Sequence, residues 1–429
     1  MAPTRSRGWA VVVNILAVIG ALTLLAGLVV GGIAAVVLVR DRDRTDQVNT
    51  ELAPFYTAPA DIPDQPGVVV KSEPLGFDVV GGTGYRIIYT SQDAAGSTVP
   101  VSGMVFVPDA PAPPGGRKVL AYAHGTVGTD PSCAPSRATS AGQLASADWL
   151  DPALQQGWVV AATDYLGLGL PGPSSYLIGG QEARDVVNSV RATQSFAGAD
   201  AGADWVVFGS SQGGNSALWT ANLAEQIAPE LDLQAVMASV PAAELGATVE
   251  AQWTTAAAWA LSPAILSSWP DYYPDEDFTA ILSEDAKSAL GELSKLCIID
   301  QAIDGLIRDK AGQRFFTSNP IDDPSWARGI REQTPPIPDP ELPMLLLQGT
   351  ADQVVLAGSN ATLQNQWCEV RPMTSLWLGG VEHQDTVNAG GPAAINWARQ
   401  RFAGAEPFNT CEFGVPAPIR PLPNPLPRE

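Results

Sequence analysis

Short apolar runs recur along most of the chain and are typical of buried β-strands. Longer stretches with few helix breakers lie between several of them, such as residues 182–196 and 392–402. Buried runs that alternate with helices indicate a mostly parallel sheet covered by helices on both faces. Two alternating runs, residues 85–91 and 98–108, predict an antiparallel opening to that sheet. The buried runs are residues 118–123, 158–163, 205–209, 233–239, 343–349 and 374–380.

The spacing of the runs changes once, between residues 239 and 343, where the gap is too long for a single crossover. This gap holds several aromatic residues and then the helix-like segment 282–307. We therefore predict a helical cap at residues 242–341, inserted over a core formed by residues 67–241 and 342–411.

The amino-terminal segment, residues 9–39, contains no charged side chain. A helix of that length spans roughly 45 Å, against about 30 Å of bilayer hydrocarbon. The segment lacks an Ala-x-Ala cleavage site, which favours an uncleaved transmembrane or signal-anchor helix, with a cleaved signal peptide as the alternative. A stalk is expected at residues 40–66 and a proline-rich tail at residues 412–429.

Charge and cysteine content limit the partners and the compartment. The formal net charge of −21 argues against nucleic acid as a partner and against tight docking of the globular part on anionic lipid. The four cysteines form no C-x-x-C pair, so disulfides in an oxidising compartment are a better interpretation than a metal site. We expect an extracytoplasmic protein, held to the membrane by the amino-terminal helix or secreted if that helix is cleaved.

An apolar run is followed directly by two serines flanked by glycines in residues 205–219, WVVFGSSQGGNSALW. The pattern G-x-S-x-G fits only with Ser211 at its centre, because centring on Ser210 would require glycine at Phe208 and Gln212. A strand, a tight turn and a helix are the context of a nucleophile elbow. A strand-to-helix turn without a catalytic role is the alternative.

A serine nucleophile needs a base, and the chain has only two histidines, His124 and His383. Of the two, only His383 follows the serine, as the Ser, acid, His order of the α/β-hydrolase fold requires. Asp352, after the run 343–349, is the candidate acid. Asp385 lies too near His383 in sequence, and Asp339 precedes the strand. A surface-loop histidine and a turn-closing aspartate are the alternatives for His383 and Asp352.

An oxyanion hole requires main-chain N–H donors aimed at the developing negative charge. One candidate is the amide of Gln212, at the start of a helix, where the helix dipole favours an anion. The second is the amide of Thr126, in the loop after an early strand. We expect His124 to be structural in that loop, and Asp164 and Tyr165 to brace it.

Six segments, in order, resemble the secretory lipase family, the lipase A-like α/β-hydrolases of fungi and actinobacteria. The resemblance covers about residues 53–411, and it implies an α/β-hydrolase fold that hydrolyses carboxylic esters, often acylglycerols. It also implies a Ser-Asp-His triad under a helical cap, at Ser211, Asp352 and His383, with Thr126 in the oxyanion loop. The segments are PFYTAPADIPDQPGVVVKSEPL, AYAHGTVG, TDYLGLG, GSSQGG, LQGTADQVV and VEHQD.

Two features depart from the family pattern. Fungal members have a cysteine close before the catalytic histidine, where this chain has Glu382, so their disulfide map does not transfer. An uncleaved anchor is also not typical of the family.

The four cysteines allow three disulfide pairings. We favour Cys368 with Cys411, bracketing the loop of the candidate base, and Cys133 with Cys297, tying the oxyanion loop to the cap.

Together these observations predict a monomeric serine esterase or lipase that acts on small-molecule or lipid esters. The predicted chemistry needs no cofactor and no metal. Two alternatives stay open. One is an extracytoplasmic acyltransferase with the same triad. The other is a non-catalytic surface binding protein, since a hydrolase fold does not by itself imply catalysis.

Overall fold

The computed structural model describes residues 48–140, 143–144 and 147–427. The chain divides into two compact units, Met1–Pro54 and Phe55–Glu429, and every element below belongs to the second. The predicted transmembrane or signal-anchor helix, residues 9–39, lies outside the described residues. Within the described part of the chain, no helix combines the length and the apolar character that a bilayer crossing demands.

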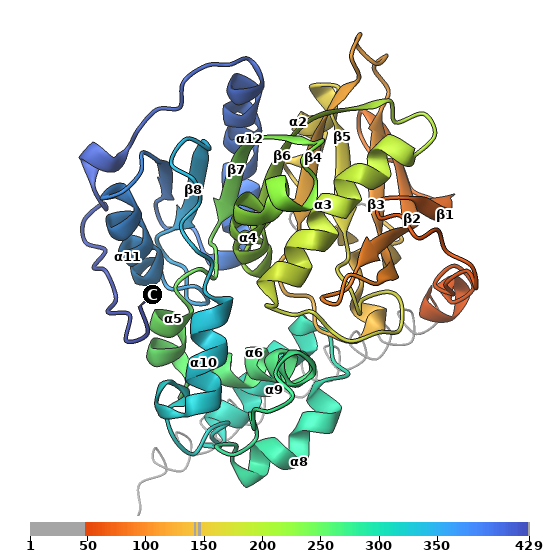
Figure 1. The fold of residues 1–429 in the computed structure, drawn as a ribbon. Coiled ribbons are helices and arrows are strands. Elements are labelled where there is room, and N and C mark those ends of the chain that lie inside the picture. Colours follow the sequence, from red (N-terminus) through yellow and green to blue (C-terminus); the bar gives the residue numbers. More distant parts are fainter. Residues whose placement is uncertain (1–47, 141–142, 145–146, 428–429) are drawn as a thin grey trace, which may run out of the picture. The chain divides into compact units, whose positions relative to one another are not determined.

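One sheet organises the second unit (Figure 1), with the strand order β1-β2-β3-β5-β4-β6-β7-β8-β9. The first neighbours, from β1 to β5, pair antiparallel, and every pair from β5 to β9 is parallel. The mostly parallel sheet predicted from the apolar runs is therefore confirmed. The strands are β1 (Val69–Pro74), β2 (Gly82–Gln92), β3 (Thr98–Pro108), β4 (Arg117–Ala123), β5 (Val159–Thr163), β6 (Ala201–Ser210), β7 (Asp232–Ser239), β8 (Met344–Gly349) and β9 (Thr374–Leu378).

Helices cover both faces of the sheet, which explains why the central strands are apolar without alternation. Along β6, Val206 and Phe208 pack in a core with α2 and α12. Their neighbours Trp205 and Val207 pack on the opposite face with α3, α4 and α11. The covering helices are α2 (Leu150–Gln155), α3 (Gly179–Ser195), α4 (Gln212–Ile227), α11 (Ala357–Cys368) and α12 (His383–Phe402).

A helical insertion separates β7 from β8 and gathers beyond one end of the sheet (Figure 1). Buried aromatic side chains form a separate core there, with edge-to-face pairs such as Trp269–Phe278 at 5.6 Å and Phe278–Trp326 at 5.7 Å between ring centroids. Most of the aromatic residues of this region therefore hold the insertion together. Its helices are α5 (Leu245–Gln252), α6 (Ala256–Leu266), α7 (Trp269–Tyr272), α8 (Glu284–Leu293), α9 (Ile298–Lys310) and α10 (Pro324–Gln333).

Two disulfides connect distant parts of the second unit, so the expected disulfide bonding is confirmed. Cys133–Cys297 joins the loop after β4 to the residue that precedes α9. Cys368–Cys411 joins the end of α11 to a short turn beyond α12. The proline-rich segment that follows packs back on the molecule, where Asn424 Nδ2 donates to Glu244 Oε2 at 2.7 Å.

Candidate active site

The turn between β6 and α4 holds Ser211 in an unusual backbone conformation, with φ 59° and ψ −116°. A positive φ at a residue with a side chain costs roughly 1–3 kcal/mol and marks functional turns. The flanking glycines make this turn feasible. A Cβ on Gly209 would lie 1.9 Å from the Gly213 carbonyl oxygen, and one on Gly213 would lie 1.9 Å from the oxygen of Ala123. The G-x-S-x-G spacing thus follows from the close approach of three main-chain segments.

Three side chains from separate elements form a continuous hydrogen-bonded chain. His383, the first residue of α12, has Nε2 3.0 Å from Ser211 Oγ and Nδ1 2.7 Å from Asp352 Oδ2. An ionised carboxylate only accepts hydrogen bonds, so Nδ1 carries the proton and donates to Asp352. Nε2 is then free to accept the hydroxyl proton of Ser211, which is the arrangement of a serine nucleophile with its base.

The loop after β8 fixes the direction of the Asp352 carboxylate, which is almost fully buried. Its Oδ1 accepts from the main-chain N–H groups of Val354 at 2.8 Å and Val355 at 2.9 Å, leaving Oδ2 for the imidazole. The competing carboxylates, Asp385 and Asp339, are both exposed, and the His383 ring bonds to neither. The structure thus brings together Ser211, His383 and the acid favoured by the sequence.

Two main-chain donors lie beside this chain. Gln212 begins α4, so its N–H is among those that a helix leaves without an internal partner. Among the described residues, no hydrogen bond engages the N–H of Thr126. A Cβ on the neighbouring Gly125 would lie 3.5 Å from the Ser211 Cβ, which puts the Thr126 loop against the nucleophile turn. The Thr126 Oγ1 is held 3.0 Å from the hydroxyl of Tyr176.

His124 lies in the same loop but does not contact Ser211. Its Nδ1 is 2.6 Å from the Gly125 carbonyl oxygen and its Nε2 is 3.2 Å from that of Asp164. Burial lowers the pKa of His124. The Asp164 carboxylate accepts hydrogen bonds from Ser102 Oγ at 2.6 Å and from the Ser136 N–H at 3.0 Å. These contacts support the structural roles expected for His124 and Asp164.

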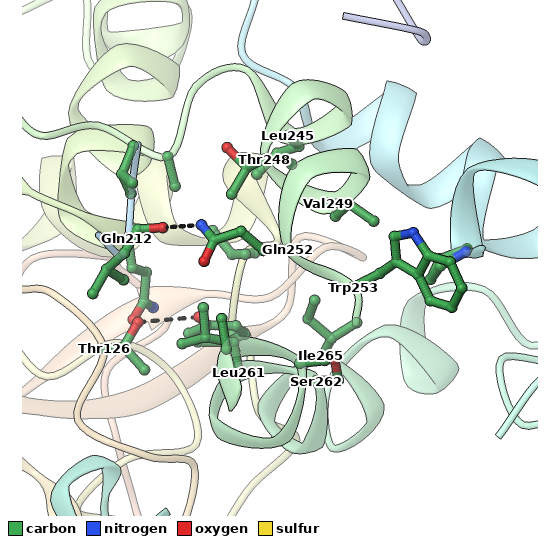
Figure 2. Close-up of a pocket in the computed structure, with 18 of the residues that line it drawn as sticks. Thr126, Gln212, Leu245, Thr248, Val249, Gln252, Trp253, Leu261, Ser262 and Ile265 are labelled. Carbon is green, nitrogen blue, oxygen red and sulfur yellow. Dashed lines mark hydrogen bonds between the residues drawn. The ribbon is translucent and has the colours of Figure 1, made fainter. Parts of the chain in front are cut away.

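A mostly apolar cavity of about 100 Å³ opens beside Ser211, between the nucleophile turn and the insertion. Figure 2 shows Thr126 and Gln212 on one side of it, and Leu245, Val249 and Leu261 from α5 and α6 around the rest. Sequence reasoning missed this lining, because residues of a helical insertion carry no motif. Three aromatic residues of the insertion, Trp253, Phe316 and Trp326, border the cavity.

Metal ligands do not gather at this site. Across residues 48–140, 143–144 and 147–427, no group of three or more His, Cys, Asp or Glu side chains could hold an ion.

The parallel sheet, the strained serine turn and the helices on both faces define an α/β-hydrolase. The family model described as secretory lipase matches residues 135–410, and the chain belongs to that family. The resemblance noted in the sequence is confirmed, and with it membership of a family of lipases and esterases.

Relatives cover most of the chain at low identity. Lipase 5 of Candida albicans is 25% identical over 392 residues, which are 84% of this chain and 82% of that protein. A Mycobacterium tuberculosis protein named "Probable inactive lipase MT1628" is 24% identical over 383 residues, 82% of each chain. The X-ray structure of Candida antarctica lipase A superposes with a TM-score of 0.68 at 20% identity, covering 85% of this chain and 88% of that one. The two proteins therefore share their fold over most of this chain.

The backbone contact at Gly213 generates a first prediction. Gly213→Ala places a Cβ against the Ala123 carbonyl, so α4 must move away from β4 and carry Ser211 with it. We expect ester hydrolysis to fall below a hundredth, with a loss of about 1–3 kcal/mol in the free energy of unfolding, typical of overpacking.

Gly291→Ala is the matched control, because no atom lies within 4 Å of a Cβ at that position in α8. It should leave hydrolysis unchanged and gain up to about 1 kcal/mol of stability. Both variants are measured by chemical denaturation and by a soluble-ester assay. Full activity in Gly213→Ala would contradict the proposed origin of the turn.

Proposed function

We propose that this protein is a serine carboxylester hydrolase that acts on lipid esters through Ser211, His383 and Asp352. The observation that carries the proposal is the unbroken hydrogen-bonded chain from Ser211 Oγ through the His383 ring to Asp352. Membership of the secretory lipase family supports the same reaction class. Ser211 is the nucleophile, His383 the general base and acid, and Asp352 the group that orients the ring.

Each step of the proposed ester hydrolysis is assigned to a side chain or main-chain amide of the site. Ser211 Oγ attacks the ester carbonyl carbon while His383 Nε2 takes the hydroxyl proton, and the Thr126 and Gln212 amides bind the oxyanion. Collapse of the tetrahedral intermediate breaks the bond to the alcohol, which leaves with the proton from His383. Water then attacks the acyl-enzyme with the same base, and the acid product departs. His383 returns each proton that it takes up, and no step uses a cofactor.

The cavity supports an apolar acyl group as the part of the substrate bound next to Ser211. Its walls come mainly from α5 and α6, and apolar side chains such as Leu261 and Ile265 dominate them. Burying each methylene of an acyl chain there contributes about 0.8 kcal/mol. An acylglycerol-like ester fits this chemistry, and the insertion, predicted as residues 242–341, acts as the cap that supplies the acyl site.

The name of the Mycobacterium tuberculosis relative gives one specific reason to consider a non-catalytic binding protein as the second candidate. The presence of a nucleophile, a base and an acid in hydrogen-bonding contact supports catalysis in this chain.

Labelling with a fluorophosphonate decides between the two candidates. We expect covalent modification at Ser211 alone, because within the described part of the chain no other hydroxyl lies in hydrogen-bonding distance of a histidine nitrogen. Ser211→Ala should abolish both labelling and hydrolysis. Ser210→Ala is the matched control, since the adjacent Ser210 is buried in β6, and it should keep both. Undiminished labelling in Ser211→Ala, measured by peptide mass spectrometry, would exclude the proposed nucleophile.

The two histidines give a prediction in which pH separates their roles. His383→Ala should reduce kcat/KM by about 10³-fold or more, because the base is lost. His124→Ala should cost up to about 10²-fold, because it loosens the loop of one oxyanion donor.

Wild-type activity should fall on the acid side, because a protonated histidine cannot accept the serine proton. His124→Ala should keep this acid limb at reduced height, because the His124 ring contacts main-chain carbonyl oxygens and not Ser211. Rate profiles between pH 5 and 9 test this. An acid limb that vanished in His124→Ala but survived in His383→Ala would reverse the assignment.

We also propose that residues 40–429 act outside the cytoplasm, as a monomer. The family and the two disulfides support an extracellular or secreted protein. Residues 9–39 would then anchor the protein to the membrane unless they are removed. Amino-terminal sequencing of the mature protein tests the anchor. We expect the original amino terminus and sedimentation with membranes until detergent is added, whereas a start beyond about residue 32 would show a cleaved signal.

A further inference from the structure

Glu182 is a buried carboxyl directly behind the nucleophile turn, and the reaction described above does not use it. It lies in the first turn of α3 with no exposed surface. Its Oε1 accepts from Gln212 Nε2 at 2.6 Å and from the Leu177 N–H at 2.9 Å, and its Oε2 accepts from Ser216 Oγ. Two of these donors stand one turn apart on α4, and the third comes from the loop before α3.

These contacts reach both halves of the oxyanion hole. On one side, the carboxyl holds the side chain of Gln212, whose main-chain N–H is one donor. On the other side it holds Leu177, which has a left-handed backbone with φ 51°. The residue before it, Tyr176, places its hydroxyl 3.0 Å from Thr126 Oγ1, and Thr126 provides the second donor. Figure 2 shows Thr126 and Gln212 together at the cavity wall.

The surroundings of Glu182 offer hydrogen bonds but no positive charge. The ion pairs among the described residues include none to Glu182. The titratable groups that face it are Asp185 on the same helix, Tyr165, Tyr176 and Tyr272. Burial raises the pKa of Glu182 to about 7, against the hydrogen bonds from Ser216 and Gln212 that lower it. Hydrogen bonds alone, without a cation, therefore hold the Glu182 carboxylate behind the site.

We propose that Glu182 is the positioning residue of the oxyanion hole: as a carboxylate it locks the Gln212 side chain and the Tyr176–Leu177 turn, and thereby aims the Gln212 and Thr126 amides. This inference rests on the proposed function. Hydrogen bonds to an ionised acceptor are about twice as strong as neutral ones, and only the ionised form accepts from all three donors.

Protonation of Glu182 rearranges this network. The new O–H must find an acceptor, and Ser216 Oγ is the one in contact. Ser216 then stops donating to Glu182 and turns its proton to the Gln212 carbonyl oxygen, 3.2 Å away. The support behind the Gln212 amide weakens as a result. Activity therefore requires two deprotonated groups, His383 and Glu182.

Stability and activity then change in opposite directions with pH. The pKa of Glu182 in the folded protein, about 7, lies above its ordinary value of 4.5. Between these values the folded state binds the extra proton, so the free energy of unfolding falls as pH rises. Over the same rise the oxyanion hole gains its ionised support.

Asp185 provides a matched control one turn further along α3. It is equally buried, and burial raises its pKa to about 7 as well. Its carboxylate accepts from Ser91 Oγ at 2.6 Å, from the Leu166 N–H at 2.9 Å and from Gln181 Nε2 at 3.2 Å. None of these three donors belongs to the nucleophile turn or the Thr126 loop.

The experiment compares wild type, Glu182→Gln and Asp185→Asn on a soluble short-chain ester between pH 5 and 9. For Glu182→Gln we expect kcat to fall roughly 10- to 100-fold with KM nearly unchanged, since oxyanion donors act in the transition state. Its acid limb should be less steep than the acid limbs of wild type and Asp185→Asn, because only one of the two groups is left to titrate. Asp185→Asn should keep kcat within about threefold and alter only the pH dependence of unfolding.

Ser216→Ala adds a variant that changes little in shape. It removes a donor that favours the ionised form, so it should raise the pKa of Glu182 and move one component of the acid limb to higher pH. An acid limb that is no steeper in wild type than in Glu182→Gln would overturn the proposal, as would a Glu182→Gln enzyme with wild-type kcat. Equal effects of Glu182→Gln and Asp185→Asn would also overturn it. These outcomes are distinguishable from failure of the proposed function, which would appear as hydrolysis that persists in Ser211→Ala.

Discussion

The close approach of β4, the serine turn and α4 governs the rest of the site. The main chain at Gly213 comes so near the Ala123 carbonyl that no side-chain atom fits between them. Because the contact is between backbones, repacking of side chains does not relieve it. The same contact sets the direction of Ser211 Oγ, the start of α4 at Gln212 and the path of the chain after β4. This one steric constraint thus fixes the turn that holds Ser211 against the end of β4.

The sheet explains how residues far apart in sequence meet at this point. Parallel strands end at the same edge, and the register pairs Ala123 with Gly209, Ser210 with Ser239, and Gly349 with Leu378. The loops after β4, β6, β8 and β9 therefore start at similar heights. Each supplies one part of the proposed chemistry: an oxyanion donor, the nucleophile, the acid and the base. A side chain at the other end of these parallel strands is too far away to contact the site.

The sequence was sufficient where local chemistry leaves few choices. Ser211 follows from glycine spacing that a strained turn requires, and His383 is the only histidine beyond it. Asp352 follows from the rule that functional groups lie after strands. The position of β5 between β3 and β4 was not predictable, because lateral order depends on contacts between distant segments. The position of Glu182 behind the site was not predictable for a similar reason. In the sequence it resembles any helical glutamate, and only the fold shows that it is buried.

The Cys133–Cys297 bridge restricts how the insertion can move. Beside it, the Ile298 N–H donates to the Val127 carbonyl oxygen at 2.9 Å, and Gly128 and Cys297 form a β-bridge. The start of α9 is therefore fastened to the loop that carries Thr126, by a covalent bond and by main-chain hydrogen bonds. A rigid outward swing of the whole insertion would drag that loop away from the serine. If the insertion moves to admit a bulky ester, it must therefore pivot around the start of α9. In that movement α5 and α6 shift while the beginning of α9 stays in place.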